Sequence, residues 1–561
     1  PSYTEDLTDL DLADGSSGWD ESSNTAWDDS TGAAPAYQDS EYPYIQGQYA
    51  VTFDCTKSGR GTLISSNYGS NFSVPTDGAI LIWVNFSSPP TLDTYANGGM
   101  GVIVGNGYGD FYNWDCGGSD YGSYPYGGWQ NFAVNPDDAS TGNDAPSADD
   151  TVGSPTGNWS YFGASVYLLA GISKGEVFQV DAIRGGRCSA IFEYGDLSNG
   201  YCTIDGFATE NDYNDATNGY HRWGLIQTVP GGYLWKGRMQ LGSASNAVDF
   251  RDSKVLVFIQ DTPLVTANFN TIEVLNASSR VDMTGFQFIC LDPTNTNSKG
   301  RWITTNDADI NLDTCQFTDM ATFTFDSNTV AVDCIWTRCG QIDPGGGDLS
   351  FSSILESSVT GGGSAGGGAL LWNDSGDPNT KINDSTFTKG AGSHHAIEFG
   401  TSSATTINLT NMTFTGFSAS DQQTTSVLYF PDKGTDTTWT VNHSGSTGTI
   451  SYYKARSGDT VTVAASAPVT ITVKDESQTV ISGARVGVYT NDASRTEIIN
   501  SNTNVSGVAS GSWTGSTPQS VEVRARYSPS GSTRYLPFSQ IATISGSGLS
   551  LDVTLREDPN A

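Results

Sequence analysis

The chain has 561 residues, enough for three or four domains, and carries 61 acidic against 26 basic residues for a formal net charge of −35. A surface of that sign repels phosphate backbones and anionic lipids, so neither nucleic acid nor a membrane is an expected partner. Abundant Gly and aromatic residues, with short apolar runs between Ser-, Thr-, Asn- and Asp-rich turns, are typical of an all-β protein.

Residues 1–44 are acidic and rich in Gly, Ser and Asp, with Trp19 and Trp27 isolated among them. Such a segment buries too little apolar surface to fold alone, so we expect an extended arm that orders against a partner or against the rest of the chain. The chain opens without a basic and apolar leader and has no run of about 20 apolar residues. We therefore expect synthesis as a soluble protein without a signal peptide.

Residues 45–177 contain short apolar runs separated by Gly, Pro and Asn turns, which predicts a β-sandwich of the jelly-roll or lectin type. Aromatic residues cluster in a Gly-rich part of this segment. Aromatic faces on a loop suit sugar stacking, although the same side chains could fill a subunit interface or a loop core. The glycan-binding candidates are Tyr112, Trp114, Tyr121, Tyr124, Tyr126 and Trp129.

A short phrase repeats through residues 271–465: an apolar anchor, a small or apolar residue three places later, and Phe five places later. Repeats of this length predict stacked parallel strands, a β-helix whose equivalent side chains form columns. Residues 178–270 are less regular and are expected to hold the first rungs and a cap. The superposed copies are Met283/Phe286/Phe288, Leu312/Cys315/Phe317, Ile382/Ser385/Phe387 and Leu409/Met412/Phe414, with a weaker copy at Val332/Ile335/Thr337.

Residues 466–561 change character again, with alternating runs such as 469–473 and 521–525 that predict a seven-strand sandwich. The run from Val469 to Val488, with the later Gly507-Val-Ala509, resembles the prealbumin-like or carboxypeptidase-regulatory-like Ig fold. This domain is therefore expected to be Ig-like.

The layout as a whole resembles large structural proteins of tailed bacteriophages over about three quarters of the chain. Its landmarks are the segment 178–185, a β-helix of the pectin-lyase-like kind, and the sandwich that contains residues 534–538. A β-helix of that kind is right-handed and parallel. The resemblance implies a virion component, such as a capsid fibre, a decoration protein or a tail spike, and commonly a homotrimer.

β-Helix proteins are often polysaccharide lyases or hydrolases, and such enzymes use paired carboxylates. Asp307, Asp309 and Asp313 lie close together, and Glu398 follows the pair His394 and His395. In so acidic a chain these clusters also arise from composition, because turns favour Asp. We expect no catalytic site, with Asp307, Asp309 and Glu398 as the runner-up candidates.

No cofactor or metal is expected. Calcium is the one ion that could be held, weakly, by Asp9 with Asp11 or by Asp307 with Asp309. Cys334 and Cys339 could form half of a zinc site, but no second pair or His lies at suitable spacing. Most of the eight cysteines are expected to be buried thiols.

The first functional hypothesis is a non-enzymatic structural protein of a phage particle, located in the virion, which contacts capsid or tail proteins and adheres to host surface glycans. Its trimer would bury apolar rung faces. The alternatives are a tail-spike depolymerase that cleaves host polysaccharide and a bacterial surface adhesin.

Overall fold

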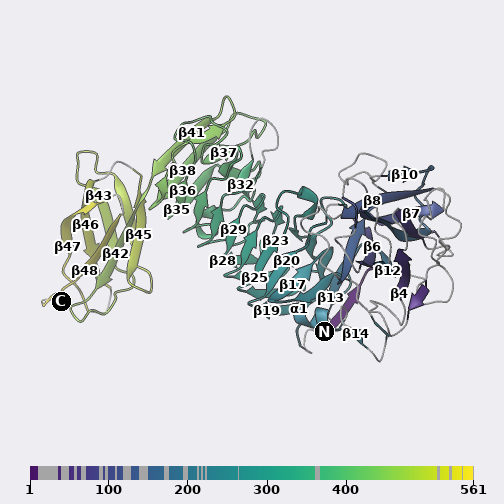
Figure 1. Ribbon diagram of the computed structural model, residues 1–561. Helices are drawn as coiled ribbons and strands as arrows, with labels where there is room; N and C mark the ends of the chain where they lie inside the picture. Colours follow the sequence, from purple (N-terminus) through teal and green to yellow (C-terminus); the bar gives the residue numbers. More distant parts are fainter. Residues whose placement is uncertain are drawn as a thin grey trace. The chain divides into compact units, whose positions relative to one another are not determined.

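The computed structural model describes residues 1–10, 36–38, 50–55, 60–64, 71–86, 92–94, 99–107, 110–117, 128–137, 150–169, 176–193, 200–210, 214–215, 219–220, 224–262, 264–359, 367–514, 518–529, 533–545 and 548–559 (Figure 1). Within these ranges the secondary structure is almost entirely strand, with one α-helix, α1 (Ile204–Glu210). The expected all-β class is confirmed. The chain forms two compact units, residues 1–330 with 337–340 and residues 331–336 with 341–561, which we describe separately.

The first unit begins with two antiparallel sheets whose facing side chains form one apolar core, which includes Ile82, Val104 and Val180. One sheet has the order β10-β8-β7-β11-β5 and the other the order β3-β4-β12-β6-β9. Their strands are β3 (Ala36–Gln38), β4 (Ala50–Cys55), β5 (Arg60–Ile64), β6 (Ala79–Phe86), β7 (Met100–Gly107), β8 (Asp110–Gly117), β9 (Gly128–Val134), β10 (Asp150–Val152), β11 (Tyr161–Tyr167) and β12 (Glu176–Gly186).

The domain boundary expected after residue 177 is wrong, because strand β12 continues across it. It pairs antiparallel with β4 and β6, so that Phe178 lies opposite Phe86 in the sandwich and not in a rung. An apolar run has the same appearance in either sheet, which is why the sequence left the boundary ambiguous. The solenoid begins instead with β13 (Ser189–Glu193), which pairs parallel with β18.

Rungs of parallel strands follow in the first unit. One sheet has the order β13-β18-β21-β24-β27, a second β17-β20-β23-β26 and a third β19-β22-β25. The strands are β17 (Gly232–Trp235), β18 (Arg238–Leu241), β19 (Asp249–Ser253), β20 (Leu256–Ile259), β21 (Thr271–Val274), β22 (Arg280–Thr284), β23 (Gln287–Cys290), β24 (Arg301–Thr304), β25 (Asp309–Asp313), β26 (Gln316–Thr318) and β27 (Phe323–Thr324).

The second unit contains further parallel rungs, in the orders β30-β32-β34-β37-β40, β31-β33-β36-β39 and β35-β38-β41. Its strands are β30 (Ile342–Asp343), β31 (Ser353–Leu355), β32 (Gly368–Trp372), β33 (Thr386–Thr388), β34 (His395–Phe399), β35 (Thr406–Thr410), β36 (Thr413–Thr415), β37 (Leu428–Phe430), β38 (Thr438–Ser444), β39 (Thr447–Gly448), β40 (Tyr453–Ala455) and β41 (Thr460–Ala465).

The predicted columns are present in each unit. In the first, Met283 lies in register with Leu312 and Phe288 with Phe317; in the second, Phe387 lies in register with Phe414. All of these side chains are buried. Each rung therefore buries its apolar side only because the next rung covers it, as expected of a solenoid.

The weaker copy of the repeat is displaced by one residue from its expected alignment. The side chains that point inward are Ala331, Cys334 and Trp336, all of them fully buried, whereas Val332, Ile335 and Thr337 are only half-buried. Hydrophobicity alone could not decide between the two alignments, because each set of three side chains includes apolar residues. A further copy, which was not predicted, is Leu349/Ser352/Ile354, with Ile354 in register with Phe387.

The position two residues after each anchor has a left-handed backbone. Its φ lies between 54° and 65° in eight rungs, at Lys254, Gly285, Thr314, Asp333, Phe351, Asp384, Asn411 and Gly445. Asn, Asp and Gly tolerate this conformation best, which explains their frequency there. The turn also joins rungs, since the N–H of Asp384 donates to Thr410 O at 3.0 Å and that of Asn411 to Ser444 O at 2.7 Å.

The start of the chain covers the first rung. Strand β1 (Ser2–Glu5) pairs antiparallel with β13, and the Tyr3 ring contacts Phe192 at 5.7 Å and Phe207 of α1 at 6.2 Å between centroids. An open solenoid end would expose unpaired strand edges and core side chains. The first ten residues of the expected arm thus order against the same chain, and residues 11–35 lie outside the described residues.

The outward faces of two rung strands, β25 and β35, are polar. On β25 the exposed side chains are Asp309, Asn311 and Asp313, and on β35 the outward positions are Thr406, Asn408 and Thr410. These strands therefore do not have the apolar outer faces that we expected a trimer to bury.

The second unit ends in a sandwich of two sheets, with the orders β45-β42-β48 and β44-β43-β46-β47. Its core includes Val469, Ile471, Val488, Val523 and Val553. The strands are β42 (Ala467–Lys474), β43 (Arg485–Thr490), β44 (Glu497–Asn502), β45 (Val508–Trp513), β46 (Gln519–Arg526), β47 (Phe538–Ile544) and β48 (Leu549–Thr554).

Candidate functional site

Two of the predicted glycan-binding residues are buried and so are not available for sugar stacking. Tyr112 is 5% exposed and Trp114 is fully buried. The Tyr112 ring packs against Trp159 with centroids 5.8 Å apart. Trp129 is half-buried against Trp83. Tyr112 and Trp114 therefore belong to the sandwich core and are not glycan ligands; Tyr121, Tyr124 and Tyr126 lie outside the described residues.

The runner-up carboxylates are associated with strands of two different sheets. Asp307 is exposed just before β25, and Asp309 begins that strand in register with Arg280. Glu398 lies on β34 of another sheet, where its Oε2 accepts hydrogen bonds from Gly368 N at 3.0 Å and Gln341 Nε2 at 3.1 Å. Because β25 runs unbroken to Asp313, that residue shares the outward face with Asp309.

The two histidines beside Glu398 are fully buried. Gly390 N donates to His394 Nε2 at 3.2 Å, which leaves the proton on Nδ1 to be donated to His395 O at 3.0 Å. Burial lowers the pKa of His394. The ring of His395 stacks on Tyr429 at 4.9 Å. These contacts make both rings packing elements of the solenoid.

No group of three or more His, Cys, Asp or Glu side chains in the described ranges could hold a metal ion, and Asp11 lies outside those ranges. Seven of the eight cysteines have described side chains, and all seven are buried thiols. No helix in the same ranges has the length and hydropathy needed to cross a bilayer.

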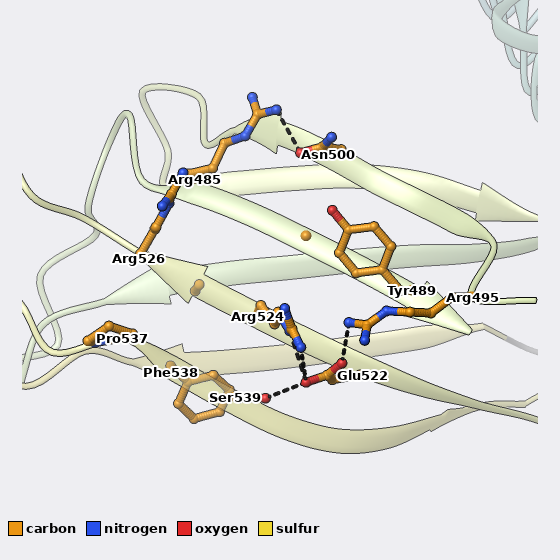
Figure 2. Close-up of a pocket in the computed structure, with 12 residues that line it drawn as sticks. Arg485, Tyr489, Arg495, Asn500, Glu522, Arg524, Arg526, Pro537, Phe538 and Ser539 are labelled. Carbon is orange, nitrogen blue, oxygen red and sulfur yellow. Dashed lines mark hydrogen bonds and ion pairs between the residues drawn. The ribbon is translucent and has the colours of Figure 1, made fainter. Parts of the chain in front are cut away.

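A groove of about 740 Å³ lies on the C-terminal sandwich, over the outer face of β43 and β46 (Figure 2). Gly487 forms part of its floor, and the Tyr489 ring lies over this glycine, since an added Cβ would come within 2.8 Å of the ring. The residues that line it are Arg485, Gly487, Tyr489, Arg495, Asn500, Glu522, Arg524, Ala525, Arg526, Pro537, Phe538 and Ser539.

Two arginines occupy opposite positions on adjacent strands at one part of the groove. Arg485 on β43 and Arg526 on β46 are paired in register, and both are exposed. Arg485 donates to Asn500 Oδ1 at 2.6 Å, a neutral acceptor. Within the described part of the chain, no carboxylate forms an ion pair with either arginine. Like charges directly opposite one another destabilise a sheet.

Glu522 organises the other part of the groove. Its carboxylate accepts from Arg495 Nη2 at 2.7 Å, from an Arg524 nitrogen at 2.9 Å and from Ser539 Oγ at 3.0 Å (Figure 2). The hydrogen bond from Arg524 is the main cause that lowers the pKa of Glu522. The Arg495 guanidinium also lies 5.5 Å from the Tyr489 ring centroid. These contacts hold the two guanidiniums in place.

The groove concentrates positive charge in a chain that is otherwise acidic. Residues 467–561 carry seven Lys or Arg and eight Asp or Glu, so this segment contributes only one unit of the net charge of −35. Four of its arginines line the groove. Guanidinium groups bind carboxylate, sulfate or phosphate oxygens through paired donors, so the groove can hold an anionic group.

None of the residues predicted from the sequence belongs to this site. The alternation in Arg485-Val-Gly-Val-Tyr489 and Glu522-Val-Arg-Ala-Arg526 places charged and aromatic residues on one face of each strand, and that period-two signal was present.

Comparison with protein-family models gives no match, and neither does comparison with curated proteins. Among solved structures, an exo-beta-agarase is similar, with 11% identity and a TM-score of 0.20. The match covers 32% of this chain and 25% of that one. A likeness at this level carries no argument about fold or activity.

Proposed function

We propose that the chain is a non-enzymatic structural protein of a tailed-bacteriophage particle, a fibre or decoration protein that attaches to capsid or tail and adheres to host surface glycans. The layout that resembles such proteins supports the proposal. The observation that carries it is the in-register stack of buried side chains in each unit, with Phe288 over Phe317 and Phe387 over Phe414.

The stack suits a mechanical role. Backbone hydrogen bonds run from rung to rung, as from Gln316 N to Phe286 O at 2.8 Å and from Thr413 N to Ser385 O at 3.0 Å. Each rung is held by its neighbours, so the stack of rungs within each unit resists bending without a bound cofactor. Strands β25 and β35 expose polar side chains, which help to keep a protein present in many copies soluble.

The C-terminal sandwich supplies the adhesive part of the proposal. Its groove is open and lined by arginine and aromatic side chains. Many identical copies on one particle turn weak individual contacts into strong overall attachment, because later contacts form within an already tethered particle.

Gold-labelled antibodies against residues 467–561 test the location. Electron microscopy of phage particles from the source culture is expected to show label on the particles, and its position will separate capsid from tail. Label confined to cell envelopes would instead identify a bacterial adhesin and reject the proposal.

An assay for new reducing ends tests the absence of catalysis. The purified chain is expected to release none from host surface polysaccharide. Release by the wild-type chain that is lost in Asp307→Asn, Asp309→Asn or Glu398→Gln would establish a depolymerase in place of the proposed function.

A further inference from the structure

We propose that the groove over β43 and β46 binds a linear polysaccharide that carries carboxylate or sulfate groups, with one anionic group held between Arg485 and Arg526. This inference deepens the proposed adhesion to glycans and rests on it. It names the ligand class and the residues that select it.

The opposed arginines carry the inference. Arg485 and Arg526 lie in register on adjacent strands, so the sheet brings two cations together that no described carboxylate pairs with. An anion placed between two guanidiniums removes their repulsion and gains charge-assisted hydrogen bonds from both. The pair therefore gains more from an anionic ligand than from a neutral one.

The position of the groove favours a polysaccharide over a peptide. Strands β43 and β46 are the central strands of their sheet, each already paired on both sides in the order β44-β43-β46-β47. An extended peptide that binds by strand addition needs an unpaired edge, which these strands do not offer. A sugar chain needs only side-chain donors, acceptors and apolar faces.

The remaining lining provides those groups. Tyr489 and Phe538 border the groove and present ring surface to the apolar faces of sugars, while Asn500 and Ser539 can bond to hydroxyls (Figure 2). A volume of about 740 Å³ holds a ligand of several sugar units, because small-molecule sites of roughly 300–1,000 Å³ hold drug-sized ligands.

Glu522 sets a limit on ligand charge. It lies inside the groove, held ionised by Arg495 and Arg524, and so repels an anion placed beside it. A polymer with charges spaced along the chain can place a neutral part there, whereas a densely charged polymer cannot. The groove thus selects a moderately charged glycan.

Affinity electrophoresis of the full chain in gels with polygalacturonate, dextran sulfate or neutral dextran tests the proposal. We expect retardation by at least one anionic polymer and none by dextran, with retardation that falls as salt rises. Retardation by polygalacturonate identifies carboxylate as the source of the anion, and retardation by dextran sulfate alone identifies sulfate. Equal retardation by dextran, or no retardation by any polymer, would overturn the inference.

The double variant Arg485→Gln/Arg526→Gln is expected to weaken binding to the anionic polymer at least tenfold. Its control is Arg556→Gln, which removes a 78% exposed arginine of the same sandwich outside the groove and should leave binding unchanged. Equal affinity in the double variant and the wild type would reject the assigned residues.

The melting temperature shows whether the double variant is still folded. Removal of the like-charge pair should leave the melting temperature of the free double variant equal or higher, while added polymer should raise it only in the wild type. A double variant that melts lower and binds less would count against the inference, because a purely structural role would then explain the loss. Antibody label on phage particles together with failed polymer binding would reject this site while leaving the proposed virion role intact.

Discussion

The rings of Phe288 and Phe317 lie in adjacent rungs with centroids 5.6 Å apart and planes inclined by 7°. Phe387 and Phe414 repeat this arrangement in the second unit at 5.3 Å and 21°. Each ring covers the next, so the apolar area that one rung buries depends on its neighbours.

Truncation of one ring in this column should therefore lower the denaturant concentration at which several rungs unfold. We expect Phe317→Ala to reduce the free energy of unfolding by about 3–5 kcal/mol, through lost burial and the cavity that remains. Gln316→Ala, on the same strand but exposed, should change it by less than about 0.5 kcal/mol. Urea titration followed by tryptophan fluorescence measures both, and equal effects would show that the column is not a core.

The columns could be predicted because one spacing recurs, with Phe five places after the anchor. The predicted alignment of the repeat was wrong by one residue at Val332. In that rung the inward side chains are Ala331, Cys334 and Trp336, which differ from the inward residues of the other copies. The position with a left-handed backbone gives the correct alignment, because Asp333 occupies the place that Asn411 and Asp384 hold in other rungs. Backbone conformation, more than hydrophobicity, sets the register of a rung.

Phe351 occupies that same left-handed position with a φ of 61° and is 53% exposed. A bulky side chain costs about 1–2 kcal/mol in this conformation, whereas Asn adopts it readily. We expect Phe351→Asn to raise the free energy of unfolding by about 1 kcal/mol. The control Phe351→Ala removes the ring but lacks the side-chain amide with which Asn bonds the local backbone in this conformation, so it should stabilise less. A loss of stability in Phe351→Asn would mean that the ring has a binding or packing role.

The groove on the C-terminal sandwich could not be predicted from the spacing of residues along the sequence. Period-two alternation places Arg485 and Tyr489 on one face of a strand, but their pairing with Arg526 and Glu522 depends on strands distant in sequence. The ion pairs that hold Arg495 and Arg524 also depend on that pairing. The assignment of Tyr112 and Trp114 to a glycan site was wrong for a related reason, because hydrophobicity cannot say whether such a side chain faces the core or solvent.

Arg238 joins the N-terminal sandwich to the first rungs. It is buried, and its guanidinium forms ion pairs with Asp77 at 3.0 Å and with Glu273 on β21. Arg238→Ala would leave two carboxylates without this partner, so we expect a loss of about 3–5 kcal/mol in unfolding free energy. Arg280→Ala, which removes a partly exposed ion pair with Asp282, should cost less than about 1 kcal/mol. Equal losses in chemical denaturation would contradict this assignment.

His394 should make the solenoid sensitive to acid. Burial lowers its pKa below the ordinary value of 6.5, so the folded state binds this proton less readily than the unfolded state. The stability that it contributes is present above pH 6.5 and is lost as the pH falls through the folded pKa. We expect His394→Gln to be less stable at pH 7 but to lose less stability between pH 7 and pH 4.5. An unchanged slope in denaturation midpoints would assign the acid sensitivity to other groups.

Glu5 should make the docking of β1 sensitive to pH in the opposite direction. Burial raises its pKa from 4.5 to about 7, against the lowering effect of Arg184. Because the folded state holds the proton more tightly, the stability that Glu5 contributes is fully present below pH 4.5 and is lost as the pH rises through about 7. Hydrogen exchange of the amides in β1 and β13, corrected for intrinsic rates, should therefore show more protection at pH 5 than at pH 8. Glu5→Gln should remove most of this difference and keep β1 docked at pH 8, since a neutral side chain of similar shape imitates the protonated acid. Protection that falls equally with pH in both proteins would show that the Glu5 carboxyl does not control the strand.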